Sequence, residues 1–217
     1  MVYKGYTKQA TSQKMMRIIK REYILSIIIA GIQSGHVTLE RTEPTPEGMR
    51  RSDMDWHEAN RTTMTIKHAT FDKELFDYKL YLIRSTEWLD KSLVSVEEKD
   101  GFHIATFTDT NKLRLYYNWL HKKKEFTIQN VLKYMYSPLF LAMHFLDQVV
   151  PINGDLSLVF DLPKSDLDEL KKWMLEVLQY ETVFTADNHC AFVDTEKVRQ
   201  DVIKAAMQYY MQTTTEE

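Results

Sequence analysis

The stretch that decides the fold is residues 23–36, YILSIIIAGIQSGH, an apolar run closed by glycines. An almost unbroken apolar run is typical of a helix that is buried on all sides. Gly31 and Gly35 lie at its end, where a glycine stops a helix because it accepts a left-handed backbone. Ala30 and Gly31 are small enough to let another backbone approach closely. The sequence therefore predicts a buried central helix over residues 15–33.

The segments that follow this helix alternate between strand and helix patterns. Apolar residues alternate at 36–42 and 62–68, which predicts a hairpin with a long, proline-containing loop. Helical spacing of apolar residues then covers 71–84. The order helix, two strands, helix, two strands, helix predicts one α+β unit. Its last elements are strands at 92–97 and 102–108, joined by an Asp100-Gly101 turn, and a helix at 113–120.

The rest of the chain repeats this order with a shorter first hairpin. Ser137-Pro138 opens a second apolar helix that runs to Asp147, with proline in the first turn where its missing N–H costs little. Only residues 149–155 separate this helix from the next strand, so its first hairpin is truncated. An internal duplication is the simplest description. The remaining elements are a strand at 156–162, a helix at 165–179 capped by Ser165, strands at 181–186 and 190–193, and a helix at 196–211.

Composition and charge limit the classes of function. The chain has 217 residues and a single cysteine, Cys190, so it forms no intramolecular disulfide, which favours a reducing compartment. It has no run of about 18 apolar residues, so we expect no membrane span. Residues 1–135 contain 22 basic and 17 acidic residues, whereas residues 136–217 contain 6 and 14. This asymmetry predicts that the first half meets phosphates and the second half meets another kind of partner.

Two stretches resemble the LAGLIDADG homing endonucleases. Residues 27–36, IIIAGIQSGH, resemble the opening motif of the family in its Leu-Gly-Asp-Gly-His variant. Residues 124–148, KEFTIQNVLKYMYSPLFLAMHFLDQ, resemble the segment that leads from Lys-x-Ile-Pro-x-x-Leu to Leu-Thr-Pro-x-x-Leu-Ala-x-x-Phe-Met-Asp-Asp. The resemblance implies an α+β fold of two pseudo-symmetric αββαββα repeats, the second with a truncated first hairpin. It divides the chain into a basic N-terminal arm (1–19), a first repeat (20–124), a linker (125–136), a second repeat (137–211) and a tail (212–217).

The resemblance also implies where metal-binding acids would lie. In the family, the last acid of each motif helix holds a divalent metal beside the scissile phosphates. By position these acids fall on Ser34 and Gln148, and neither is a carboxylate. Asp147 lies one residue earlier, and a helix turns by about 100° per residue, so we expect it to coordinate metal weakly at best. His36 and His144 are expected to be core or interface histidines. We therefore predict no metal, no cofactor and no endonuclease activity.

In the family, strands from both repeats form a saddle that lies along the nucleic-acid duplex. Here the truncated hairpin and the acidic balance of the second repeat weaken half of that saddle, because acids repel phosphate. The first repeat keeps basic residues on or beside its predicted strands and loops. We predict phosphate contacts from Arg41, Arg50, Arg51, Arg61, Lys67, Lys99, Lys122, Lys123 and Lys124.

The leading hypothesis is a non-cutting protein that binds structured RNA, either ribosomal or intron RNA, through residues 1–135. It would belong to an organellar ribonucleoprotein, such as the mitochondrial ribosome or a plastid particle, with protein neighbours on the acidic second repeat. It needs neither a membrane nor a homo-oligomer. Alternatives are a maturase-like splicing cofactor, a site-specific DNA-binding regulator, a protein-only scaffold, and an endonuclease with an unorthodox metal site on Asp147 and Asp155.

Overall fold

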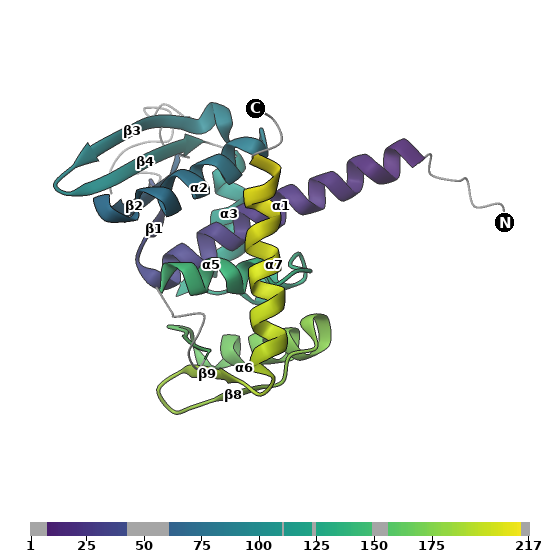
Figure 1. Cartoon of the computed structure of the whole chain (residues 1–217). Helices are drawn as coiled ribbons and strands as arrows, with labels where there is room; N and C mark the ends of the chain where they lie inside the picture. Colours follow the sequence, from purple (N-terminus) through teal and green to yellow (C-terminus); the bar gives the residue numbers. More distant parts are fainter. Residues whose placement is uncertain (1–7, 43–60, 110, 123–124, 149–155, 214–217) are drawn as a thin grey trace.

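Two α+β halves meet at a pair of central helices (Figure 1). The computed structural model describes residues 8–42, 61–109, 111–122, 125–148 and 156–213, with side chains described between Lys20 and Ala205. No described helix has the length and apolar character needed to cross a membrane.

The first half follows the predicted order of elements. Helix α1 leads into the hairpin β1–β2, helix α2 packs on this hairpin, and a second hairpin, β3–β4, leads into helix α3. The elements are α1 (Lys8–Ser34), β1 (Val37–Arg41), β2 (Thr62–Ala69), the 3-10 turn η3 (Thr70–Asp72), α2 (Lys73–Ser85), the 3-10 turn η4 (Asp90–Ser92), β3 (Leu93–Lys99), β4 (Phe102–Asp109) and α3 (Lys112–Leu120).

The second half is shorter and follows a structured linker. The linker contains β5 (His121–Lys122), β6 (Glu125–Phe126) and α4 (Gln129–Leu132). The second half contains α5 (Leu139–Asp147), β7 (Ser157–Val159), α6 (Lys164–Trp173), the π-helix η5 (Met174–Leu178), β8 (Thr182–Phe184), β9 (His189–Phe192) and α7 (Thr195–Thr213).

The two sheets share a strand order. The first sheet is antiparallel in the order β1-β2-β4-β3, and the second is antiparallel in the order β7-β9-β8. In sequence and sheet position β7, β8 and β9 correspond to β2, β3 and β4. Within the described residues nothing in the second sheet corresponds to β1, which agrees with the truncated hairpin, although residues 149–155 lie outside the description. The symmetry relation between the repeats stays a prediction.

The core is centred on α1 and α5, which pack against each other (Figure 1). Every side chain at residues 24–30 of α1 is fully buried, and so is nearly all of α5. The predicted close approach occurs at Gly31, where an added β-carbon would lie 2.1 Å from Val37 Cγ2. The absence of a side chain at Gly31 therefore lets β1 fold back directly against the helix that precedes it.

Two predicted segments have secondary structure of their own, and one predicted cap is wrong. The predicted basic arm is helical from Lys8 onward, because no glycine or proline interrupts the chain between that residue and Gly31; Figure 1 shows this part of α1 projecting from the body. The predicted linker at 125–136 contains β6, which pairs with β5 just before it, and the helical turn α4. Ser165 does not cap α6, which starts at Lys164 without a side-chain cap.

Candidate functional site at the ends of the central helices

The end of α1 is a glycine-terminated turn that positions the first candidate residues. Gly35 has a φ of +77°, which suits glycine, and His36 N donates to Gly31 O at 2.7 Å. This bond satisfies a carbonyl of the last helical turn and reverses the chain into β1. As a result, Ser34 and His36 lie beside the C-terminal end of α5.

Ser34 occupies the first position at which the family resemblance implies a metal-binding acid. Its Oγ donates within its own helix, to Ala30 O at 2.9 Å and Gly31 O at 3.2 Å, and lies 3.2 Å from His36 Nδ1. A hydroxyl that bonds back to the preceding turn caps the helix end. Ser34 therefore contributes local helix geometry and no negative charge.

Gln148 occupies the second such position and serves as a structural clamp. Its Nε2 donates to Val159 O at 2.7 Å, and Val159 N donates to its Oε1 at 3.1 Å. The side-chain amide thus continues the hydrogen bonding of β7 and ties it to α5. His144 is fully buried and donates from Nε2 to the same carbonyl at 2.8 Å, so it is a core histidine as predicted.

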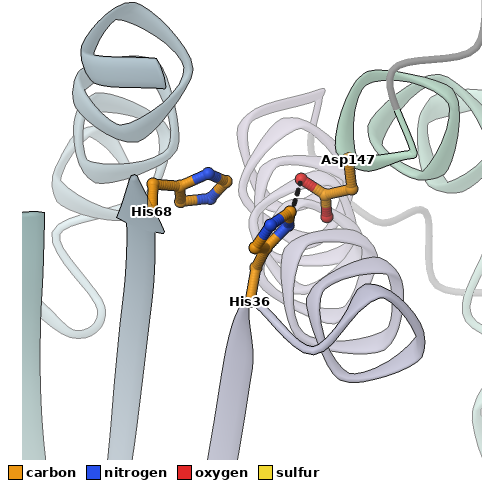
Figure 2. A group of neighbouring side chains, drawn as sticks. All are labelled: His36, His68 and Asp147. Atoms are coloured by element: carbon orange, nitrogen blue, oxygen red, sulfur yellow. Dashed lines mark ion pairs between the residues drawn. The ribbon is translucent and has the colours of Figure 1, made fainter. Parts of the chain in front are cut away.

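Asp147 belongs to a buried polar cluster (Figure 2). Its Oδ1 forms an ion pair with Lys79 Nζ, and both side chains are fully buried. His36 Nδ1 lies 3.6 Å from the same oxygen, and Lys79 Nζ lies 3.0 Å from His68 Nε2. The rings of His36 and His68 stack with centroids 4.3 Å apart. The cluster joins four elements, because Lys79 comes from α2, His68 from β2, His36 from the start of β1 and Asp147 from α5.

Burial and charge set the protonation of this cluster. Burial, reinforced by the charge of Lys79, lowers the pKa of His68 to about 3, so this ring is neutral at pH 7. Burial opposes the charge of Asp147, but its hydrogen bond with His36 and the ammonium of Lys79 together hold its pKa below the usual range. Burial also lowers the pKa of Lys79, against the opposing effect of Asp147.

The magnesium chemistry implied by the resemblance does not fit these residues. Mg²⁺ prefers carboxylate and water oxygens in an octahedral arrangement. Ser34 and Gln148 offer no carboxylate, and Asp147 already faces an ammonium. We expect Asp147 to coordinate metal weakly at best, and the physical reason is the ammonium of Lys79, which already lies beside its carboxylate. Asp155, the second acid of the unorthodox endonuclease hypothesis, lies outside the described residues.

Sequence reasoning missed His68 and Lys79. Lys79 does carry a detectable signal, because it lies on the apolar stripe of its helix, four residues from both Leu75 and Ile83. Lysine is seldom buried without a partner, so its position calls for a buried acid. No local pattern indicates which acid that is. Asp147 is 68 residues away in the chain.

Comparison with known proteins identifies the architecture. No family model and no curated protein matches this sequence. The solved structure of the homing endonuclease I-WcaI bound to its DNA recognition sequence is similar with a TM-score of 0.55 at 10% identity, over 93% of this chain and 88% of that chain. A structure of mesophilic variants from the homing endonuclease I-DmoI is similar with a TM-score of 0.51 at 13% identity, over 84% of this chain and 97% of that chain. This chain has the homing endonuclease fold.

The homing endonuclease fold is the one that the LAGLIDADG resemblance predicts, so the predicted fold is confirmed. At these identities the likeness concerns architecture alone. The roles of individual side chains must therefore be read from this chain's own geometry, which differs between the outer faces of its two sheets.

The outer face of the first sheet is polar and open. The register aligns Thr38, Thr65, Thr106 and Ser95 in one row of hydroxyls across all four strands. Lys67 and Lys99 lie on the same face and are exposed, each paired across strands with a residue of β4. Lys67 Nζ lies 3.8 Å from the centroid of the Phe102 ring, so the ring helps to orient the cation. Glu40 and Glu97 lie on this face as well. The hydroxyls and lysines therefore suit local contacts to phosphates and base edges and do not form a broad cationic surface.

The other predicted phosphate contacts are dispersed. Arg41 pairs in register with the buried Thr62, which places it on the helix-facing side of the sheet. Arg61 is exposed just before β2, and Lys122 lies by a pocket near the start of α6. The structure thus brings only Lys67 and Lys99 onto the open face. Arg50, Arg51, Lys123 and Lys124 lie outside the described residues, and phosphate contact stays a prediction for all of these cations.

The outer face of the second sheet carries exposed valines beside Ser157 and His189, and no cation of lysine or arginine type on its described strands. Val183 pairs with Ala191, and Val159 pairs with His189, which places them on the side opposite the buried Cys190. Val159 is 40% exposed and Val183 is 56% exposed. The two faces therefore suit different partners.

Proposed function

We propose that this protein binds nucleic acid through the outer face of its first sheet and does not cleave it. One observation carries the loss of cleavage: the carboxylate that ends α5 is buried against Lys79, while the expected metal positions carry Ser34 and Gln148. Among the described residues, neither helix end offers a free carboxylate that could hold Mg²⁺ beside a phosphate.

The ligand class that we propose is structured RNA, in an organellar ribonucleoprotein such as the mitochondrial ribosome. Two features favour a permanent place in such a particle over a protein that diffuses freely and searches for a DNA site. Among the described strands, lysines lie on the outer face of the first sheet and not on that of the second, which shortens the phosphate-binding surface. The second face carries exposed valines and suits a permanent protein neighbour. Duplex DNA is the competing ligand, since the similar I-WcaI structure is described as bound to its DNA recognition sequence.

A binding assay tests the surface. Lys67→Ala with Lys99→Ala should weaken binding to a labelled RNA hairpin and reduce the salt slope by about 0.7–0.9 per lost phosphate contact. The matched control is Lys171→Ala with Lys172→Ala, which removes two exposed lysines from α6 in the other half. Equal losses in both double variants would indicate nonspecific charge effects and reject this face. Tighter binding to one duplex DNA sequence than to any RNA would favour the DNA-binding regulator.

A cleavage assay tests the loss of activity. We expect pools of supercoiled plasmid to stay intact with the protein and Mg²⁺ or Mn²⁺. Nicking by the wild-type protein that is abolished by Asp147→Asn would support the unorthodox endonuclease and contradict the proposal. An engineered site-specific nuclease assayed in parallel confirms that the plasmids and buffer support cleavage.

The protein partner is tested in cells. Tagged protein should co-sediment with a large RNA-containing particle in a sucrose gradient, and RNase should abolish this. Val159→Glu with Val183→Glu should release it from the particle, because buried carboxylates at an apolar contact are unfavourable. Leu175→Glu with Val177→Glu, which changes exposed apolar residues of the π-helix, is the control and should stay bound. Release of both variants alike, or no particle at all, would reject the contact.

A further inference from the structure

The cluster around Lys79 has the composition of a transition-metal site. His36, His68 and Asp147 each offer one ligand atom, and these atoms lie within 4.8 Å of one another (Figure 2). Two imidazoles with one carboxylate form a ligand set that suits Zn²⁺ or Co²⁺ and suits Mg²⁺ poorly. The site is therefore distinct in its chemistry from the two-acid magnesium arrangement that the resemblance implies.

Lys79 supplies the positive charge in this cluster. Its ammonium contacts Asp147 Oδ1 and lies 3.0 Å from His68 Nε2, so it faces two of the three ligand atoms. Its side chain and that of Asp147 are fully buried. Asp147 Oδ2 and His68 Nδ1 are also buried and have no hydrogen-bond partner. Asp147 Oδ2 is thus an acceptor that the ammonium leaves unused, and His68 Nδ1, which carries the proton when Nε2 accepts from Lys79, is an unpaired donor.

We infer that Lys79 is a built-in cation that occupies a latent His₂Asp transition-metal site, and that its removal lets Zn²⁺ or Co²⁺ bind there. The inference rests on the geometry of the cluster and not on the proposed nucleic-acid function. Ligands bound tetrahedrally to zinc at about 2.1 Å lie about 3.4 Å apart. The ligand atoms lie within 4.8 Å of one another, so the farthest pair must approach by about an ångström or slightly more to close around an ion. In the wild type the ammonium blocks this adjustment.

The test is a gain of metal binding. Lys79→Met keeps a long apolar side chain and removes the charge. With the affinity tag cleaved off, this variant should bind one equivalent of Co²⁺ and show the visible absorption of tetrahedral coordination. It should bind at least about a hundredfold more tightly than wild type, because metal no longer competes with a buried ion pair. Lys73→Met removes an exposed lysine from the same helix and should behave as wild type.

A folding measurement and one further variant keep the inference falsifiable if Lys79→Met folds poorly. That variant should fold when Zn²⁺ is supplied and lose structure in chelator. Lys79→Met with Asp147→Asn should fold without metal, because no charge is left unpaired, and should show no cobalt band. If this double variant folds while Lys79→Met binds no metal and is not rescued by Zn²⁺, the latent site is rejected. A stoichiometric cobalt band in the wild type would reject the role of Lys79 as the resident cation.

Discussion

Gly31 shows how one missing side chain shapes the site. Glycine inside a helix normally costs stability relative to alanine, by about 1 kcal/mol. Here the neighbouring strand occupies the space that a β-carbon would need, so glycine is favoured over alanine at this position. The close return of β1 is also what brings His36 next to Asp147.

Gly31→Ala should therefore lower the free energy of unfolding by about 1–3 kcal/mol, because the new methyl group overlaps Val37. Urea denaturation measures this. Gly31→Ala with Val37→Ala removes the nearest contact, at Val37 Cγ2, and keeps the one at Val37 Cβ, 2.7 Å away. Its loss should therefore be smaller than the sum of the two single losses. An increase in stability for Gly31→Ala would show that helix propensity outweighs the contact.

His68 should make stability depend on pH. Its pKa is about 3 in the folded protein and 6.5 when unperturbed, so between these values the unfolded chain takes up a proton that the native state refuses. Stability is therefore lost as pH falls through this window, by at most about 1.4 kcal/mol per pH unit from this residue. His68→Gln should flatten the slope of unfolding free energy against pH between 6.5 and about 4.

The matched control for this pH measurement is His189→Gln, which removes an exposed histidine from β9. It should leave the slope close to that of wild type. His144, whose pKa burial also lowers, remains in both variants and contributes equally to them. A slope that His68→Gln leaves unchanged would contradict the neutral, buried state of this ring.

Helix α5 depends on another helix for its start. It has no side-chain cap from its own N-cap residue, Pro138. Instead the buried Glu22 of α1 accepts hydrogen bonds from Tyr136 N at 2.9 Å and from Ser137 N and Oγ, both at 2.7 Å. A negative charge at a helix N-terminus also interacts favourably with the helix dipole. Helix α5 is thus linked to α1 at both of its own ends. Glu22 makes the link at the N-terminal end of α5, and the Lys79 cluster joins Asp147 at its C-terminal end to His36, which follows α1.

Glu22→Gln should destabilise the protein by about 1–3 kcal/mol, because one amide oxygen replaces a charged acceptor of three hydrogen bonds. Thermal or urea unfolding measures the loss. Glu176→Gln, an exposed residue of the π-helix, should change stability by less than about 0.5 kcal/mol. Similar effects of both substitutions would indicate that Glu22 contributes only overall charge.

The whole molecule is organised around the contact between α1 and α5. The buried part of α1 belongs to the first half and α5 belongs to the second half. Opening either half therefore exposes part of the contact between the two helices. The second half adds a small sheet and α7, which packs against α5. The most stable part of the structure should therefore lie at the centre and not within either sheet.

Native-state hydrogen exchange should show this order. Amides of residues 24–30 and 139–145 should exchange most slowly, since their release requires global unfolding. Amides of the edge strands β3 and β8 should exchange earlier. Slower exchange in either sheet than in both helices would mean that the halves are more stable than the contact between them.

Several features of this protein follow from sequence alone. The apolar run at residues 23–36 and its glycines predict the central helix, because complete burial requires an unbroken apolar surface. Asp100-Gly101 predicts a tight turn, and both residues have positive φ there, as such turns require. The assignment of the family's acid positions to Ser34 and Gln148 also comes from the sequence, through the resemblance, and stays a prediction.

Other features exist only in the tertiary structure. The partners of Lys79 come from three other elements, and a hydrogen-bond partner distant in sequence leaves no local periodicity to detect. The pairing of Arg41 with buried Thr62, and the joint exposure of Lys67 and Lys99, depend on strand register, where a shift of one residue moves every side chain to the opposite face. The sequence by itself determined the central helices and the tight turn at Asp100-Gly101, because these follow from local composition. Only folding decided which charges are buried together, because that depends on contacts between distant segments.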